Sequence, residues 1–197
     1  QYGEISNAIK VLSHQVEIGK EEEGVGVIRF RPEITIRQEP KKGQVVSGDT
    51  LIHFEKNGKY FVILCDGMGH GEAALAESRL TARLFSEFLR AGFRKEIAVN
   101  MINSTLALKA DRESFSTVDL LEINMETGVC EFLKIGSAQS FIKAKGNIIE
   151  ISSKALPVGI LESIEVETHE IELKSGDIIL MVSDGIGEAG EGIMKMS

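Results

Sequence analysis

Residues 60–71 have the sequence YFVILCDGMGHG, an unbroken apolar run that ends in an aspartate and a glycine-rich turn. A second stretch of the same kind, residues 178–186, reads IILMVSDGI. Short apolar runs bounded by turn residues are typical of fully buried strands. A carboxylate at the end of such a strand is costly unless something pairs with it. Two such strand ends, each followed by glycine, therefore indicate a site for a divalent cation.

A third aspartate, Asp49, precedes another strand-like run, residues 50–55. Asn57-Gly58 follows this run, and that dipeptide is a strong signal for a two-residue hairpin turn. Eight residues on either side of the turn place Asp49 and Asp66 at the same end of the ribbon. Carboxylate and carbonyl oxygens suit Mg²⁺ and Mn²⁺. The predicted metal ligands are Asp49, Asp66, Asp184 and the backbone carbonyl of Gly67. The three aspartates are also the predicted catalytic residues.

Two other interpretations of these turns stay open at this point. Asp-Gly is a common turn pair, so the three aspartates are also compatible with ordinary turns. A glycine-rich turn between a strand and a helix is also typical of a phosphate cradle. The lysine and hydroxyl of a P-loop are absent from residues 66–71, however, and Asp66 would repel a phosphate in the absence of a metal.

The N-terminal segment has a different pattern. Four apolar residues at helical spacing predict a helix over residues 4–19, with a narrow stripe closer to a coiled-coil seam than to a core face. The stripe consists of Ile5, Ile9, Leu12 and Val16. Residues 17–24 read as a charged linker, so we expect residues 1–24 to connect to an upstream region or to form a homodimer contact. Residues 25–197 are the predicted catalytic domain.

The remainder of the chain predicts strands around a central pair of helices. The helices are expected near residues 80–92 and 97–106, because apolar residues recur there at helical spacing. Alternating or apolar runs predict strands over residues 25–30, 34–37, 50–55, 60–64, 117–123, 129–135, 140–143, 148–151, 164–171 and 178–182. The predicted fold class is α+β, a β-sandwich of two antiparallel sheets with helices on its faces.

Composition narrows the functional classes. The chain has 197 residues, 43% hydrophobic and 26% charged, which fits one globular domain. Its net charge of -8 argues against a nucleic-acid partner, because the phosphate backbone would be repelled. No apolar run approaches the roughly 18 residues that span a bilayer. Cys65 and Cys130 both lie in apolar runs and are predicted to be buried free thiols in a cytoplasmic domain.

Six short motifs in order carry a resemblance to a known family. They are Ser47-Gly48-Asp49, residues 66–71, residues 116–120, Gly136-Ser137, residues 156–160 and Ser183-Asp184-Gly185. Together they resemble the PPM family of metal-dependent serine/threonine phosphatases, also called type 2C-like phosphatases. Residues 66–71, 102–104 and 132–137 are particularly similar to the phosphatase domain of the stage II sporulation protein E family.

The resemblance implies a function and a cofactor. It implies a PPM-like sandwich with two Mn²⁺ or Mg²⁺ ions, in which Asp66 bridges the ions, Gly67 offers its carbonyl, and Asp49 and Asp184 complete the ligand shells. It further implies hydrolysis of a phosphoserine on an anti-anti-sigma factor that controls a sporulation sigma factor. The implied whole protein is longer, with an upstream regulatory or membrane region.

One departure from the family pattern leaves alternatives open. The family places a further metal-binding aspartate well after the position of Asp184, and the chain ends at Ser197 without it. We therefore expect the domain to be C-terminally incomplete and only weakly active as given. The alternatives are a catalytically silent module that binds a phosphoprotein and a phosphomonoesterase that acts on small molecules.

Overall fold

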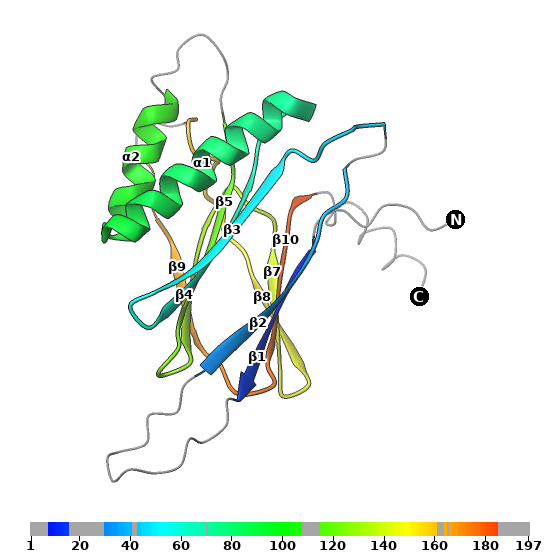
Figure 1. Ribbon diagram of the computed structural model, residues 1–197, viewed down its shortest axis with the longest axis vertical. Helices are drawn as coiled ribbons and strands as arrows, with labels where there is room; N and C mark the ends of the chain where they lie inside the picture. Colours follow the sequence, from blue (N-terminus) through cyan, green and yellow to red (C-terminus); the bar gives the residue numbers. More distant parts are fainter. Residues whose placement is uncertain are drawn as a thin grey trace.

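Two layers of strands and one layer of helices form the described part of the chain (Figure 1). The computed structural model describes residues 8–15, 30–40, 43–69, 71–107, 115–160, 164 and 166–184. Within these residues, one five-stranded sheet has the order β2-β1-β10-β7-β8 and the other the order β3-β4-β5-β6-β9. All the neighbouring strands are antiparallel. The predicted sandwich of two antiparallel sheets flanked by helices is confirmed.

The elements have the following bounds. The first sheet contains β1 (Ala8–Gln15), β2 (Phe30–Arg37), β7 (Ser140–Ala144), β8 (Asn147–Ile151) and β10 (Ile178–Val182). The second contains β3 (Asp49–Lys56), β4 (Lys59–Asp66), β5 (Val118–Asn124), β6 (Val129–Ile135) and β9 (Thr168–Glu172). The helices are α1 (Gly71–Ala91) and α2 (Lys95–Ala107). No helix in the described part of the chain has the length and apolar character that crossing a membrane requires.

The β3–β4 hairpin has the predicted turn and register. Asn57 and Gly58 have φ values of 50° and 73°, as a turn with two left-handed central residues requires. Pairing runs from Lys56 opposite Lys59 to Asp49 opposite Asp66. A local turn signal thus determines which residues face each other at the far end of the ribbon.

Helix α1 ends where the sequence predicted. Gly92 has a φ of 92° and donates its backbone N–H to the Leu89 carbonyl, while the Phe93 N–H reaches the Phe88 carbonyl. These two bonds form a Schellman motif, and the Phe88 and Phe93 rings meet edge to face across it. The side chain of Lys56 adds hydrogen bonds to the last carbonyls of the helix.

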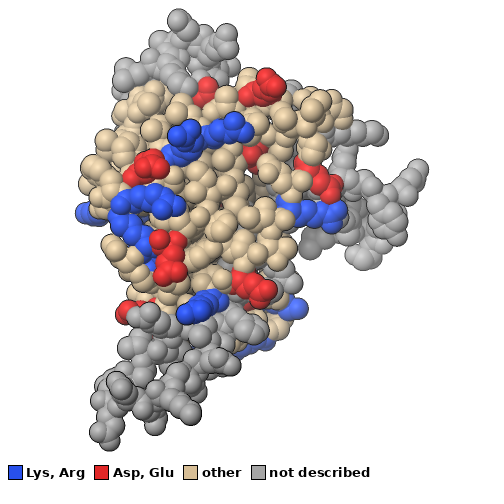
Figure 2. All heavy atoms as spheres, viewed as in Figure 1, with Lys and Arg blue, Asp and Glu red and all other residues tan. Residues whose placement is uncertain are grey.

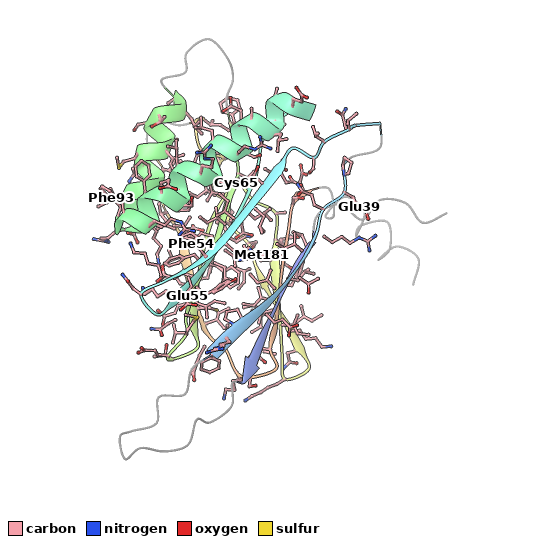
Figure 3. The ribbon with its side chains drawn as sticks, viewed as in Figure 1. Glu39, Phe54, Glu55, Cys65, Phe93 and Met181 are labelled. Atoms are coloured by element: carbon pink, nitrogen blue, oxygen red, sulfur yellow. The ribbon has the colours of Figure 1, made fainter. Side chains whose placement is uncertain are left out.

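Each face of the β3–β4 sheet covers its own apolar core. Ile63 and Cys65 point toward the helices, whereas Val62 and Leu64 point toward the opposite sheet. Figure 3 labels Cys65 on the helix side of the sandwich and Met181, which belongs to the inter-sheet core. This period-two alternation assigns Asp66 to the inter-sheet face of β4, beyond Leu64.

The prediction of an N-terminal helix is wrong over residues 8–15. These residues form β1, which lies between β2 and β10 and pairs with both. Helical spacing and strand alternation compete in a segment this short, and two neighbouring strands with unpaired edges favour the strand. The rest of the expected stripe and linker lies outside the described residues. The homodimer contact and the boundary between residues 24 and 25 stay predictions.

Of two smaller expectations, the bounds of one strand are wrong and the state of the cysteines is confirmed. The strand expected over residues 164–171 is shorter in the structure, because β9 begins only at Thr168. Both cysteines are free and buried, as predicted. Burial raises the pKa of Cys130 to about 12, so this thiol is unreactive at neutral pH.

Candidate metal centre

Two of the predicted ligands lie side by side on one sheet. Asp49 begins β3 and Asp66 ends β4, and the two residues are directly opposite each other. Asp49 is buried, with 8% of its surface exposed, and Asp66 is half-buried. Asp184 comes from the opposite sheet, directly after β10 and Ser183, and is exposed. The Asp66 carboxyl interacts with the carboxyls of both Asp49 and Asp184.

Serines from both sheets hold the Asp49 side chain. The hydroxyl of Ser47 and the hydroxyl of Ser183 each donate to Asp49 Oδ2 at 3.1 Å. Ser183 belongs to the β10 side of the sandwich, so its bond crosses between the sheets. The sequence motifs contained both serines, but only the tertiary structure shows that they share one carboxylate oxygen.

The backbone of Asp66 is held by residues just before β5. Thr117 donates its N–H to the Asp66 carbonyl at 2.9 Å, and its hydroxyl accepts from the Asp66 N–H at 3.0 Å. The Ser116 hydroxyl also donates to the Asp66 carbonyl, at 3.0 Å. Ser116 is in turn paired with Val158 from the loop over residues 156–160. These positioning roles were missed in the sequence, because hydrogen bonds between segments distant in the chain leave no local signal.

Gly67 is required for the close approach of helix α1. A Cβ at this position would lie 1.9 Å from the backbone oxygen of Ala74, in the first turn of the helix. The Gly67 N–H also bonds the Gly48 carbonyl at 3.3 Å. Glycine therefore lets the helix begin directly over the acidic strand ends.

The electrostatics of the site are dominated by uncompensated acid groups. Burial, followed by the negative charges of Asp49 and Asp184, raises the pKa of Asp66 to about 9. Burial also raises the pKa of Asp49, although hydrogen bonds from its neighbours oppose the shift. No described lysine, arginine or histidine forms an ion pair with these three carboxylates. Oxygen ligands with excess negative charge suit a hard divalent cation.

The ligand set is not a closed cage within the described residues. No three Asp, Glu, His or Cys side chains among them are gathered around one point closely enough to hold an ion. The three carboxylates instead meet in pairs through Asp66. His70 and the residues after Asp184 lie outside the described part of the chain.

The sequence profile of the stage II sporulation protein E (SpoIIE) family matches residues 56–196. The chain belongs to the SpoIIE family. Over 149 residues it is 43% identical to stage II sporulation protein E of Priestia megaterium, an alignment that covers 75% of this chain and 26% of that protein. The chain thus spans about a quarter of the length of this curated relative.

Solved structures agree with the SpoIIE assignment. The PP2C phosphatase domain with a regulatory fragment of SpoIIE from Bacillus subtilis matches with a TM-score of 0.70 and 33% identity, over 94% of this chain and 49% of that chain. RsbX in complex with magnesium matches with a TM-score of 0.62 at 18% identity, over 75% and 72%, which shows the shared fold alone. The predicted family is confirmed.

Proposed function

We propose that this chain is a phosphatase domain that hydrolyses a phosphoserine on a small regulatory protein, with Asp49, Asp66, the Gly67 carbonyl and Asp184 as metal ligands. The observation that supports the proposal most is the pairing of the Asp66 carboxyl with Asp49 and with Asp184 from the opposite sheet, with no described cationic side chain to balance them. We further propose two ions, Mn²⁺ or Mg²⁺, and a phosphorylated anti-anti-sigma factor as the substrate.

The chain's own residues would position the reaction. A bound divalent cation supplies positive charge that activates water and stabilises the charge developing on the phosphoryl oxygens. Asp66, between Asp49 and Asp184, is placed to interact with both flanking carboxylates. Ser47 and Ser183 orient Asp49, and Ser116 and Thr117 hold the Asp66 backbone. The site is thereby preorganised before a substrate arrives.

The test of this function is the loss of a single ligand. In the intact protein, Asp184→Asn should abolish Mn²⁺-dependent phosphate release from a phosphoserine protein while leaving the circular dichroism spectrum unchanged. The matched control is Glu150→Gln, an exposed carboxylate on β8. Wild-type activity in Asp184→Asn would overturn the metal role, and an inactive wild type that still binds the phosphoprotein would favour the silent binding module.

The substrate class has a separate test. The net charge of -8 means that long-range attraction to phosphate cannot by itself retain the substrate, so protein contacts must contribute. We therefore expect a much larger kcat/KM for a folded phosphoprotein than for its excised phosphopeptide. Equal values would favour the phosphomonoesterase alternative. We also propose that the domain works in the cytoplasm as part of a longer protein with an upstream regulatory or membrane region.

A further inference from the structure

A buried charged network lies beside the acidic site. Asp119 of β5 and Lys134 of β6 are directly opposite each other, and neither has any exposed surface. Lys134 Nζ lies 2.5 Å from Asp119 Oδ2 and donates to the Ser140 hydroxyl at 2.9 Å. The Ser140 hydroxyl donates to the same Asp119 oxygen at 2.7 Å. Asp119 is thus buried and hydrogen-bonded within the predicted strand over residues 117–123.

The network connects the two sheets. Asp119 and Lys134 belong to the sheet that contains β4, whereas Ser140 begins β7 in the opposite sheet. On the side away from the acidic strand ends, the inter-sheet space is apolar, with Leu121 and Phe132 next along the same strands. A polar bridge therefore replaces apolar packing at this one level of the core.

Stability alone does not account for this bridge. The free energy lost when an ion pair is removed from water is about as large as the attraction between its charges. Proteins in which apolar residues of similar size replace such a pair are often as stable or more stable. Asp119 Oδ1 is buried without a hydrogen-bond partner among the described residues, which adds to the cost. Burial raises the pKa of Asp119 even beside Lys134, in agreement with this cost.

The two ends of the network adjoin the strands that carry the candidate ligands. In one sheet, Asp119 is opposite Leu64, two residues before Asp66 on the same face of β4. Such diagonal neighbours lie roughly 7–8 Å apart. In the other sheet, Phe141 is opposite Leu180, so Ser140 lies beside the end of β10 that leads to Asp184. The bond from Ser183 to Asp49 is a second link between the sheets at this level.

We propose that the Asp119–Lys134–Ser140 network is a positioning device that sets the spacing of the two sheets at the acidic end of the sandwich and so holds Asp184 within reach of Asp66. The proposal rests on the metal role argued above. None of the three residues contacts the substrate in this scheme. They act through the strands, because a ligand set divided between two sheets depends on the distance between those sheets.

The first experiment replaces the whole network by apolar residues. Asp119→Leu/Lys134→Met/Ser140→Ala in the intact protein should unfold at a urea concentration close to that of the wild type, yet bind Mn²⁺ about tenfold more weakly by calorimetric titration. The control is Ile142→Val, which alters the same core at the next inward position of β7 without touching a polar contact. It should bind Mn²⁺ as the wild type does.

A second variant keeps the test decisive if the triple variant does not fold. Ser140→Ala retains the ion pair but removes the two hydrogen bonds that Ser140 makes across the sheets. Mn²⁺ binding should therefore weaken several-fold, and Ser140→Thr should restore it. Wild-type Mn²⁺ affinity in Ser140→Ala, or in a folded triple variant, overturns the positioning role. A wild type that binds no Mn²⁺ overturns the proposed function itself, and the positioning role falls with it.

Discussion

The inter-sheet space has an apolar end and a charged end, and the same strands contribute to both. Along β4, Val62 and Leu64 face inward and are buried, and the next inward position is Asp66. Along β5, Leu121 faces inward and the neighbouring inward position is Asp119. The alternation of inward and outward side chains thus continues along both strands, while the inward residues change from apolar to acidic. Apolar burial stabilises one end, and the other end holds charges that lower stability and that a cation would balance.

The charged side chains on the face shown in Figure 2 do not show the same division. On the face in Figure 2, acidic and basic side chains are interspersed over the helices and strands. The concentration of like charge is therefore a property of the strand ends, where Asp49, Asp66 and Asp184 meet. Like charges brought together in a partly buried place are characteristic of functional sites.

The largest expected effect comes from moving a charge into the apolar end. Leu121→Asp would bury a carboxylate opposite Val62, with no exposed surface. Lys134, diagonal to it on β6, is already paired with Asp119. We expect a loss of at least about 4 kcal/mol in the free energy of unfolding, enough to prevent stable folding. Urea denaturation would measure it, with Leu121→Met as the control. If the free energy of unfolding of Leu121→Asp lay within about 1 kcal/mol of the wild-type value, the apolar end would tolerate charge and would not differ from the charged end.

An intermediate effect is expected where helix α1 meets the charged end. Gly67→Ala should lower the free energy of unfolding by about 1–3 kcal/mol, because the new Cβ collides with the Ala74 backbone. The shift of α1 should also reduce phosphatase activity. Gly69→Ala is the informative comparison, since its φ is 100° but nothing lies within 4 Å of its Cβ. A smaller loss at Gly67 than at Gly69 would show that backbone conformation matters more than the contact.

The smallest expected effect is a gain. The pKa of Asp66 is about 9 in the folded protein against 3.8 for the free side chain, so folding takes up a proton between these values. The contribution of Asp66 to the free energy of unfolding without metal should therefore be most favourable below about pH 4. It should fall as the pH rises toward 9. At pH 8 with a chelator, Asp66→Asn should be about 1–2 kcal/mol more stable than the wild type by urea unfolding.

Saturating Mn²⁺ provides the control for this gain. It should stabilise the wild type and leave Asp66→Asn nearly unchanged, because the variant lacks the central carboxylate. The variant should keep a shallower pH dependence, since the raised pKa values of Asp49 and Asp119 remain. If the free energy of unfolding depended on pH identically in the two proteins, ionisation of Asp66 would not be what destabilises the metal-free fold.

Local signals in the sequence determined the hairpin, helix α2, the end of α1 and most strands. Helix α1 begins at Gly71, nine residues before the expected start. Asn57-Gly58 specified a two-residue turn, and that turn placed Asp49 opposite Asp66 without any information from the rest of the chain. Gly92 ended α1 because only a left-handed residue fits there. The acidic turns after two buried strands likewise predicted a metal site, because a carboxylate at a buried strand end needs a partner.

The tertiary structure decided everything that joins distant segments. Residues 8–15 became a strand because β2 and β10 offer edges to pair with, which no local pattern records. The link from Ser183 to Asp49, the hold of Ser116 on Asp66, and the bridge from Lys134 through Ser140 depend on which strands become neighbours across the two sheets. Strand order and sheet packing are set by the whole core, so these contacts could be read only from the folded chain.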